Sequence, residues 1–85
     1  MINKEILKKQ ILYRSSHRGT KEMDLLLGTF VKKHLDSFDE SELNDLKILL
    51  EIDDSILENW YFKSINNNKI KPNIVVNKLK EFKLK

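Results

Sequence analysis

The hydrophobic positions of this 85-residue chain repeat with a helical spacing and never alternate as they would in a β-strand. The clearest pattern begins near Thr20 and ends near Leu35. Its apolar side recurs every three or four positions, at Met23, Leu26, Leu27, Phe30 and Val31, with His34 one turn further on. This spacing predicts an amphipathic α-helix, in which His34 is a packed or half-buried side chain. Leu25 falls outside the apolar face, so it is either covered by another helix or exposed to a partner.

Two further segments have helical patterns. The first, from about Lys4 to Arg14, has apolar residues between lysines and predicts a helix that faces the core, although a helix lying on a membrane surface has a similar pattern. The other is predicted from about Glu40 to Glu51. At its start, Asp39 and Glu42 have the spacing of a capping box, in which Asp39 is the N-cap.

The last third of the chain predicts two more helices. One begins after Asp53, ends near Lys63 and places Trp60 in the core. A polar, asparagine-rich loop follows, and Pro72 fits the first turn of a fifth helix. The lysine-rich tail from Lys80 is expected to fray. The fold class is therefore all-α, a compact bundle of about five short helices that forms one domain over all 85 residues.

Charge and composition limit the possible functions. The net charge is +3, but it divides into +5 over residues 1–21, −8 over residues 22–62 and +6 over residues 63–85. Nucleic-acid binders usually lack such an acidic centre, so the basic ends are weak support for that function. The chain has no cysteine and only two isolated histidines, so we expect no metal site. Without an apolar run or a signal peptide, the sequence predicts a soluble, intracellular protein.

The sequence contains no recognisable catalytic motif. There is no glycine-rich phosphate loop and no nucleophile elbow. Glu22 and Asp24 are two positions apart, a spacing at which carboxylates on a helix do not face each other. The chemistry therefore favours a small binding module over an enzyme.

The best candidate for a binding site is the stretch from His17 to Asp24. Arg14 and Arg18 are the only arginines beside fourteen lysines, and Gly19 is one of two glycines. This choice of residue suggests a site that needs the planar fork of a guanidinium and not only positive charge. The alternative is that the two arginines are an ordinary solvated pair at the end of a helix.

The same stretch resembles the signature of a known family. Arg18-Gly19-x-x-Glu22 is similar to the RGxxE motif of the succinate dehydrogenase assembly factors, which are called SdhE in bacteria and Sdh5 in mitochondria. The resemblance continues through Met23-Asp24-Leu25-Leu26-Leu27-Gly28 and Phe30, then Leu49-Leu50-Glu51, Asp53-Asp54 and Asn59-Trp60. The chain departs from the family at Ser55, where a proline is expected, and in its asparagine- and lysine-rich residues 66–71.

The resemblance implies a chaperone-like assembly factor. Such a protein binds the flavoprotein subunit of succinate dehydrogenase, and often of fumarate reductase, and promotes covalent attachment of FAD to a histidine of that subunit. It holds no cofactor stably, acts as a monomer, and neither binds nucleic acid nor inserts into a membrane. Its location would be the bacterial cytoplasm, or the mitochondrial matrix in eukaryotic relatives. The residues expected to contact the partner are Arg14, His17, Arg18, Gly19, Glu22, Met23 and Asp24.

Two other functions remain open. A helical domain of this kind can be an adaptor for a different protein, which a pull-down would separate from a flavoprotein-binding factor. The lysine-rich ends can also bind a nucleic acid or a membrane surface, in which case binding would weaken steeply with salt.

Overall fold

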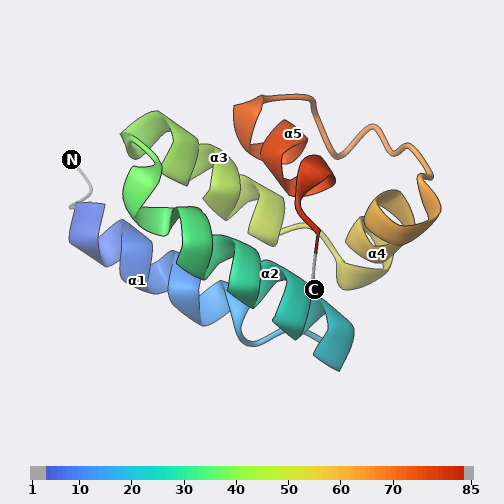
Figure 1. Ribbon diagram of the computed structural model, residues 1–85, viewed down its shortest axis with the longest axis horizontal. Coiled ribbons are helices and arrows are strands. Elements are labelled where there is room, and N and C mark those ends of the chain that lie inside the picture. The colour runs from blue at the N-terminus through green and yellow to red at the C-terminus, as the bar shows by residue number, and fades with distance from the viewer. Residues whose placement is uncertain (1–3, 84–85) are drawn as a thin grey trace.

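The computed structural model describes residues 4–83, which form five α-helices (Figure 1). The connections are short except for residues 64–73, which form a long loop between the last two helices. The helices are α1 (Lys4–Ser15), α2 (Lys21–His34), α3 (Glu40–Leu50), α4 (Asp54–Lys63) and α5 (Ile74–Glu81), with a 3-10 turn, η1 (Leu35–Ser37), directly after α2. Residues 4–83 contain no strand. The predicted all-α fold with five short helices is confirmed.

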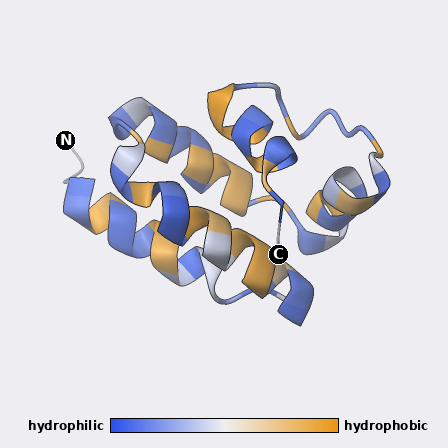
Figure 2. Cartoon of the chain, viewed as in Figure 1, coloured by the Kyte–Doolittle hydropathy of each residue, from blue (hydrophilic) through white to orange (hydrophobic). Residues whose placement is uncertain are grey.

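The three N-terminal helices form the larger part of the bundle. α1 and α2 run side by side in opposite directions, α3 packs against α1, and α5 packs against α3, with α4 at one end (Figure 1). Hydrophobic and hydrophilic residues alternate around the helices, as amphipathic helices require (Figure 2). The predicted apolar face of α2 lies wholly in the core, since its five apolar side chains have no exposed surface. The radius of gyration, 12.0 Å, is that of a compact domain of this length.

Side-chain caps fix the starts of α2 and α3. The Thr20 hydroxyl accepts a hydrogen bond from the Met23 amide at 3.2 Å. Before α3, the Asp39 carboxylate accepts from the Glu42 amide at 2.8 Å, and the Glu42 carboxylate accepts from the Asp39 amide at 3.0 Å. These bonds satisfy amides that have no partner inside the helix, and they confirm the predicted capping box.

The start of α5 differs from the prediction. Asn73 is the N-cap, its side-chain oxygen accepts from the Val76 amide at 2.8 Å, and the helix begins at Ile74. Pro72 therefore precedes the cap, and its predicted place in the first helical turn is wrong. The Asn73 side chain supplies the cap of α5, so the proline only restricts the chain that leads into it.

The remaining expectations concern single side chains and the tail. Trp60 is 5% exposed, so its predicted place in the core is confirmed. Leu25 is 59% exposed, which shows that no helix covers it. α5 ends at Glu81, and part of the lysine-rich tail, residues 84 and 85, lies outside the described residues.

His34, at the end of α2, packs among aromatic rings as the sequence predicted. Its ring stacks on Phe38 with 5.7 Å between centroids and meets Phe82 edge-on at 6.2 Å. Burial, followed by the positive charges of Lys78 and Lys33, lowers the pKa of His34 below its usual value. The folded protein thus favours a neutral imidazole.

We expect His34 to make the protein less stable in weak acid. Because the pKa of His34 is lower in the folded state, the unfolded chain binds a proton first as the pH falls. The contribution of neutral His34 to the free energy of unfolding is complete above the unfolded pKa of about 6.5. It decreases as the pH falls from there towards the folded pKa. Urea denaturation at pH 7.5 and 5.5, compared between the wild type and His34→Gln, measures this difference. An equal pH dependence in both proteins would contradict the assignment to His34.

Candidate partner-binding site

Arg18 binds the loop between α1 and α2 to the junction of α3 and α4. Its Nε and Nη2 atoms each lie 2.7 Å from Oδ1 of Asp54, the first residue of α4. The Arg18 side chain is only 9% exposed. This pair of residues is 36 positions apart in the chain. We call Arg18, Gly19 and Asp54, with the carbonyls of Leu50 and Ile52, the latch.

The other donors of the guanidinium satisfy carbonyls at the end of α3. Nη1 donates to the Leu50 carbonyl at 2.6 Å, and Nη2 donates to the Ile52 carbonyl at 3.0 Å. Carbonyls at a helix C-terminus lack partners within the helix, and a positive charge there also suits the helix dipole. The fork of an arginine reaches a carboxylate and two carbonyls together, whereas the single ammonium of a lysine cannot.

Carboxylates hold the backbone of the turn as well. The Gly19 amide donates to Oδ2 of Asp54 at 2.5 Å, and the Arg18 amide donates to Oδ1 of Asp24 at 2.6 Å. A Cβ atom on Gly19 would lie 3.0 Å from Oδ2 of Asp54, although its φ is not positive. The glycine therefore leaves room for the Asp54 carboxylate, which a Cβ atom would displace slightly, and it does not serve an unusual backbone conformation.

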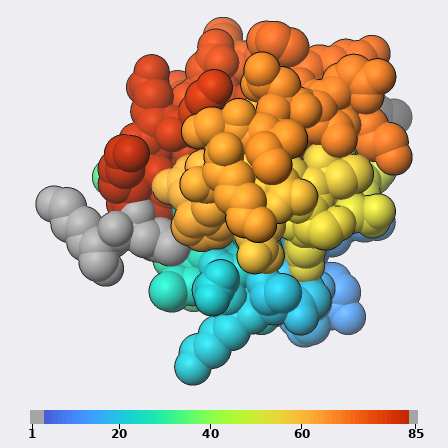
Figure 3. Space-filling model, turned by 90° about the vertical axis from the view of Figure 1, so that its right-hand side faces the viewer, coloured from blue at the N-terminus to red at the C-terminus, as the bar shows by residue number. Residues whose placement is uncertain are grey.

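The latch shapes an exposed surface at one end of the molecule. Figure 3 faces this end and shows the blue and cyan residues of the loop and of early α2 beside the yellow segment that joins α3 to α4. Glu22 lies in the first turn of α2, is exposed and makes no hydrogen bond or ion pair within residues 4–83. The positive end of the helix dipole stabilises a carboxylate at this position. A free carboxylate on a fixed turn can accept hydrogen bonds from a partner.

The other predicted site residues differ in exposure. Met23 is fully buried and supports the turn from the core, while Asp24 is half-buried through its bond to the loop. His17 is exposed, and its ring stacks on Tyr13 with 4.0 Å between centroids. The Arg14 side chain is exposed beside those of Tyr13, Lys9 and Lys47, in a shallow groove between α1 and α3.

The predicted residues thus lie together in and around the turn between α1 and α2. Gly19 and Glu22 lie at the surface, and Arg18 holds the turn from beneath. Arg14 and His17 flank the turn on the α1 side. A direct contact of any of them with a partner stays a prediction.

Asp54 is the residue of the site that the sequence did not single out. It appears in the family resemblance as half of an aspartate pair, but periodicity gives no sign that it binds Arg18. The available signal was the presence of an aspartate pair directly before a predicted helix. Asp54 of this pair makes the contact with Arg18, whereas the Asp53 side chain does not cap the helix that follows.

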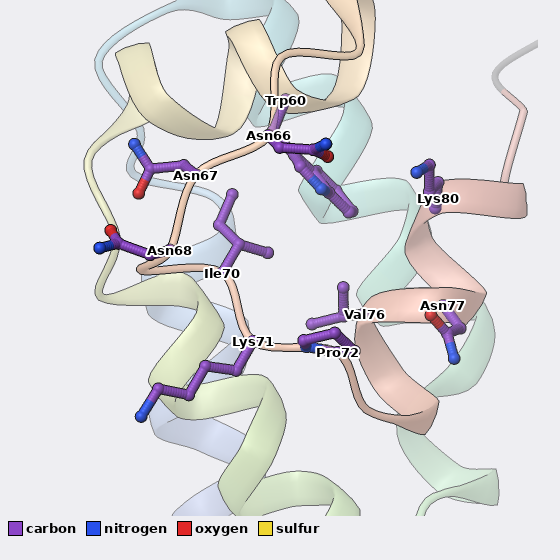
Figure 4. Close-up of a pocket in the computed structure, with 10 residues that line it drawn as sticks. All are labelled: Trp60, Asn66, Asn67, Asn68, Ile70, Lys71, Pro72, Val76, Asn77 and Lys80. Carbon is purple, nitrogen blue, oxygen red and sulfur yellow. The ribbon is translucent and has the colours of Figure 1, made fainter.

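A separate cavity of about 500 Å³ lies between Trp60 and α5 (Figure 4). The side chains of Asn67, Asn68 and Lys71 point away from Trp60, so these polar groups do not converge on a ligand position. Within residues 4–83, no three histidine, aspartate or glutamate side chains are grouped to hold a metal, and no helix has the length and hydrophobicity to cross a membrane.

Comparison with known proteins identifies relatives of this chain. It is 42% identical to succinate dehydrogenase assembly factor 2, mitochondrial, from Dictyostelium discoideum, over 73% of this chain and 48% of that protein. It is 38% identical to the FAD assembly factor SdhE from Acetobacter pasteurianus, over 65% of this chain and 50% of that protein. The Candida glabrata assembly factor 2 is 34% identical over 95% of this chain and 57% of that protein.

The chain spans about half the length of these curated relatives. No solved structure matches it significantly. The Sdh5 family, described as "Flavinator of succinate dehydrogenase", matches residues 9–83. This match covers the second half of α1 and the whole of α2 to α5. The chain therefore belongs to the Sdh5 family of succinate dehydrogenase flavinators.

Proposed function

We propose that this chain is an assembly factor that binds the flavoprotein subunit of succinate dehydrogenase and promotes covalent attachment of FAD to it. The family match and the functions for which the relatives are named support this proposal. The structural observation that carries it is an exposed Glu22 on a turn that the latch holds in one shape. A fixed turn loses little conformational entropy when a partner binds.

The chain acts by selecting a conformation of its partner and not by supplying catalytic groups. Its affinity is highest for the flavoprotein conformer in which FAD and the acceptor histidine are aligned, so binding increases the population of that conformer. Alignment of reacting groups lowers the barrier without a new chemical group. Bond formation and the stable binding of FAD belong to the flavoprotein.

The partner surface consists of the turn and the side chains around it. Glu22 accepts hydrogen bonds from donors of the flavoprotein, with Gly19 leaving room for close approach. Fumarate reductase is a further partner of the same chemistry. The protein works as a monomer in the bacterial cytoplasm or, for eukaryotic members, in the mitochondrial matrix.

Replacing Glu22 by alanine tests this function. We expect Glu22→Ala to reduce covalent flavin on the co-expressed flavoprotein at least tenfold, because the donors of the partner lose their acceptor. The melting temperature should change little because the side chain is exposed and makes no hydrogen bond or ion pair within residues 4–83. In-gel flavin fluorescence after denaturation measures the covalent product, and circular dichroism measures stability.

Glu40→Ala is the matched control. Glu40 is also an exposed glutamate in the first turn of a helix, α3, so its loss has the same helix-dipole cost. It should leave covalent flavin at the wild-type level. Full flavinylation with Glu22→Ala would show that the turn is not the contact surface, and no gain of covalent flavin with the wild-type protein would overturn the function itself.

A further inference from the structure

A groove of about 300 Å³ runs along the surface between α1 and α2, beside the latch. Leu12 of α1 and Leu25 of α2 line it, and both are exposed at 37% and 59% respectively. Asp24, which accepts from the Arg18 amide, also lines the groove and joins it to the turn. The groove is thus continuous with the surface proposed to meet the flavoprotein.

Gly28 lines the groove from the middle of α2. Its φ is not positive, and a Cβ atom there would meet no atom closer than the Ser15 carbonyl oxygen at 3.8 Å, an ordinary contact. An alanine would therefore fit and would favour the helix more than a glycine does. Neither the backbone conformation nor the internal packing requires glycine at this position. What glycine provides is depth in the groove.

The charge at the Lys32 end of the groove favours an acidic neighbour there. Asp24 lies about two helical turns away, at the end next to the turn, where it accepts a hydrogen bond from the Arg18 amide. Lys32, at the far end, is exposed and has no ion pair within the described part of the chain. A ligand that places an apolar side chain between the two leucines would bring its next residues close to this ammonium group.

We propose that this groove binds a segment of the flavoprotein that carries a large apolar side chain next to a carboxylate. The apolar side chain lies between Leu12 and Leu25 over Gly28, and the carboxylate pairs with Lys32. This inference rests on the proposed function and extends its contact surface from the turn along α2. Burial of the two exposed leucines supplies affinity, and the ion pair fixes the orientation of the segment.

Substitutions at Gly28 separate stability from binding. Gly28→Ala should raise the melting temperature by about 4–8 °C, because alanine favours the helix interior. Gly28→Leu fills the groove at a half-buried surface position, and it should weaken binding at least tenfold in a protein that still melts cooperatively. Titration with the purified flavoprotein subunit gives the dissociation constants, and in-gel flavin fluorescence gives the covalent product.

Two pairs of variants test the leucine side of the groove and the positive charge of Lys32. Leu25→Ser should weaken binding about tenfold, whereas Ile48→Ser, a change at a comparably exposed residue of α3, should have no effect. Lys32→Glu should weaken binding most at low salt. Its control is Lys33→Glu, because the Lys33 ammonium lies over the Phe82 ring, 5.7 Å from its centroid, and does not line the groove.

Three results would overturn this inference or its basis. Wild-type affinity in both Gly28→Leu and Leu25→Ser would show that the groove is not a contact surface, while the proposed function stands. A wild-type dimer in sedimentation that Leu25→Ser converts to a monomer would assign the groove to a second copy of this chain. If the wild-type protein neither binds the flavoprotein nor raises its covalent flavin, the proposed function is wrong, and the inference about the groove is wrong with it.

Discussion

Replacing Asp54 by alanine is expected to lower the free energy of unfolding by about 3 kcal/mol. The change leaves the guanidinium of Arg18, 9% exposed, without its carboxylate, and a buried charge that loses its partner is costly. It also removes the acceptor of the Gly19 amide. Urea denaturation followed by circular dichroism at 222 nm measures the change.

The neighbouring aspartate provides the control for this experiment. Asp53 is exposed and its side chain forms no cap bond, so Asp53→Ala should cost less than about 0.5 kcal/mol. A double-mutant cycle of Arg18→Ala with Asp54→Ala should give a coupling energy of about 2 kcal/mol. Equal stability of Asp54→Ala and Asp53→Ala would mean that the latch does not stabilise the fold.

Trp60→Ala is expected to cost roughly 3–5 kcal/mol. Trp60 belongs to α4 and is almost fully buried in the core. A domain of this size has about 5–10 kcal/mol of stability in total, so this loss is a large part of it. Loss of covalent flavin in this variant would therefore follow from loss of folded protein. The cavity next to the ring allows neighbouring side chains to relax, which favours the lower end of the range (Figure 4).

Phe62→Ala is the matched control for Trp60. Phe62 is an aromatic residue of the same helix but is half-exposed, so its removal should cost about 1 kcal/mol or less. Thermal unfolding of both variants, followed by circular dichroism, gives the comparison. A melting temperature of Trp60→Ala close to that of Phe62→Ala would contradict the burial of the indole.

The helices could be predicted because their signals are local. The apolar face of α2 repeats within fourteen residues, and the capping box before α3 needs only Asp39 and Glu42. The start of α5 was missed because two neighbouring residues favour different starting points. Proline favours the first helical position, which would start the helix at Pro72, whereas asparagine favours the N-cap, which starts it at Ile74.

The role of Arg18 depends on contacts that no local pattern contains. The composition indicated that this site needs a guanidinium, and the structure shows that its fork is used within the protein, on Asp54 and the end of α3. A pair separated by 36 positions leaves no periodic signal. The same holds for Leu25, because whether a helix covers a side chain is decided by the packing of the whole bundle.

The latch also determines when the turn can take its shape during synthesis. The loop at Arg18 and Gly19 is made early, but its carboxylate partner, Asp54, belongs to α4. A nascent chain in which α1 and α2 have already paired therefore lacks the group that holds the turn. The Arg18 guanidinium and the Gly19 amide gain their shared carboxylate only after the first turn of α4 has docked, so a partner that recognises the completed turn would distinguish a finished domain from an incomplete one.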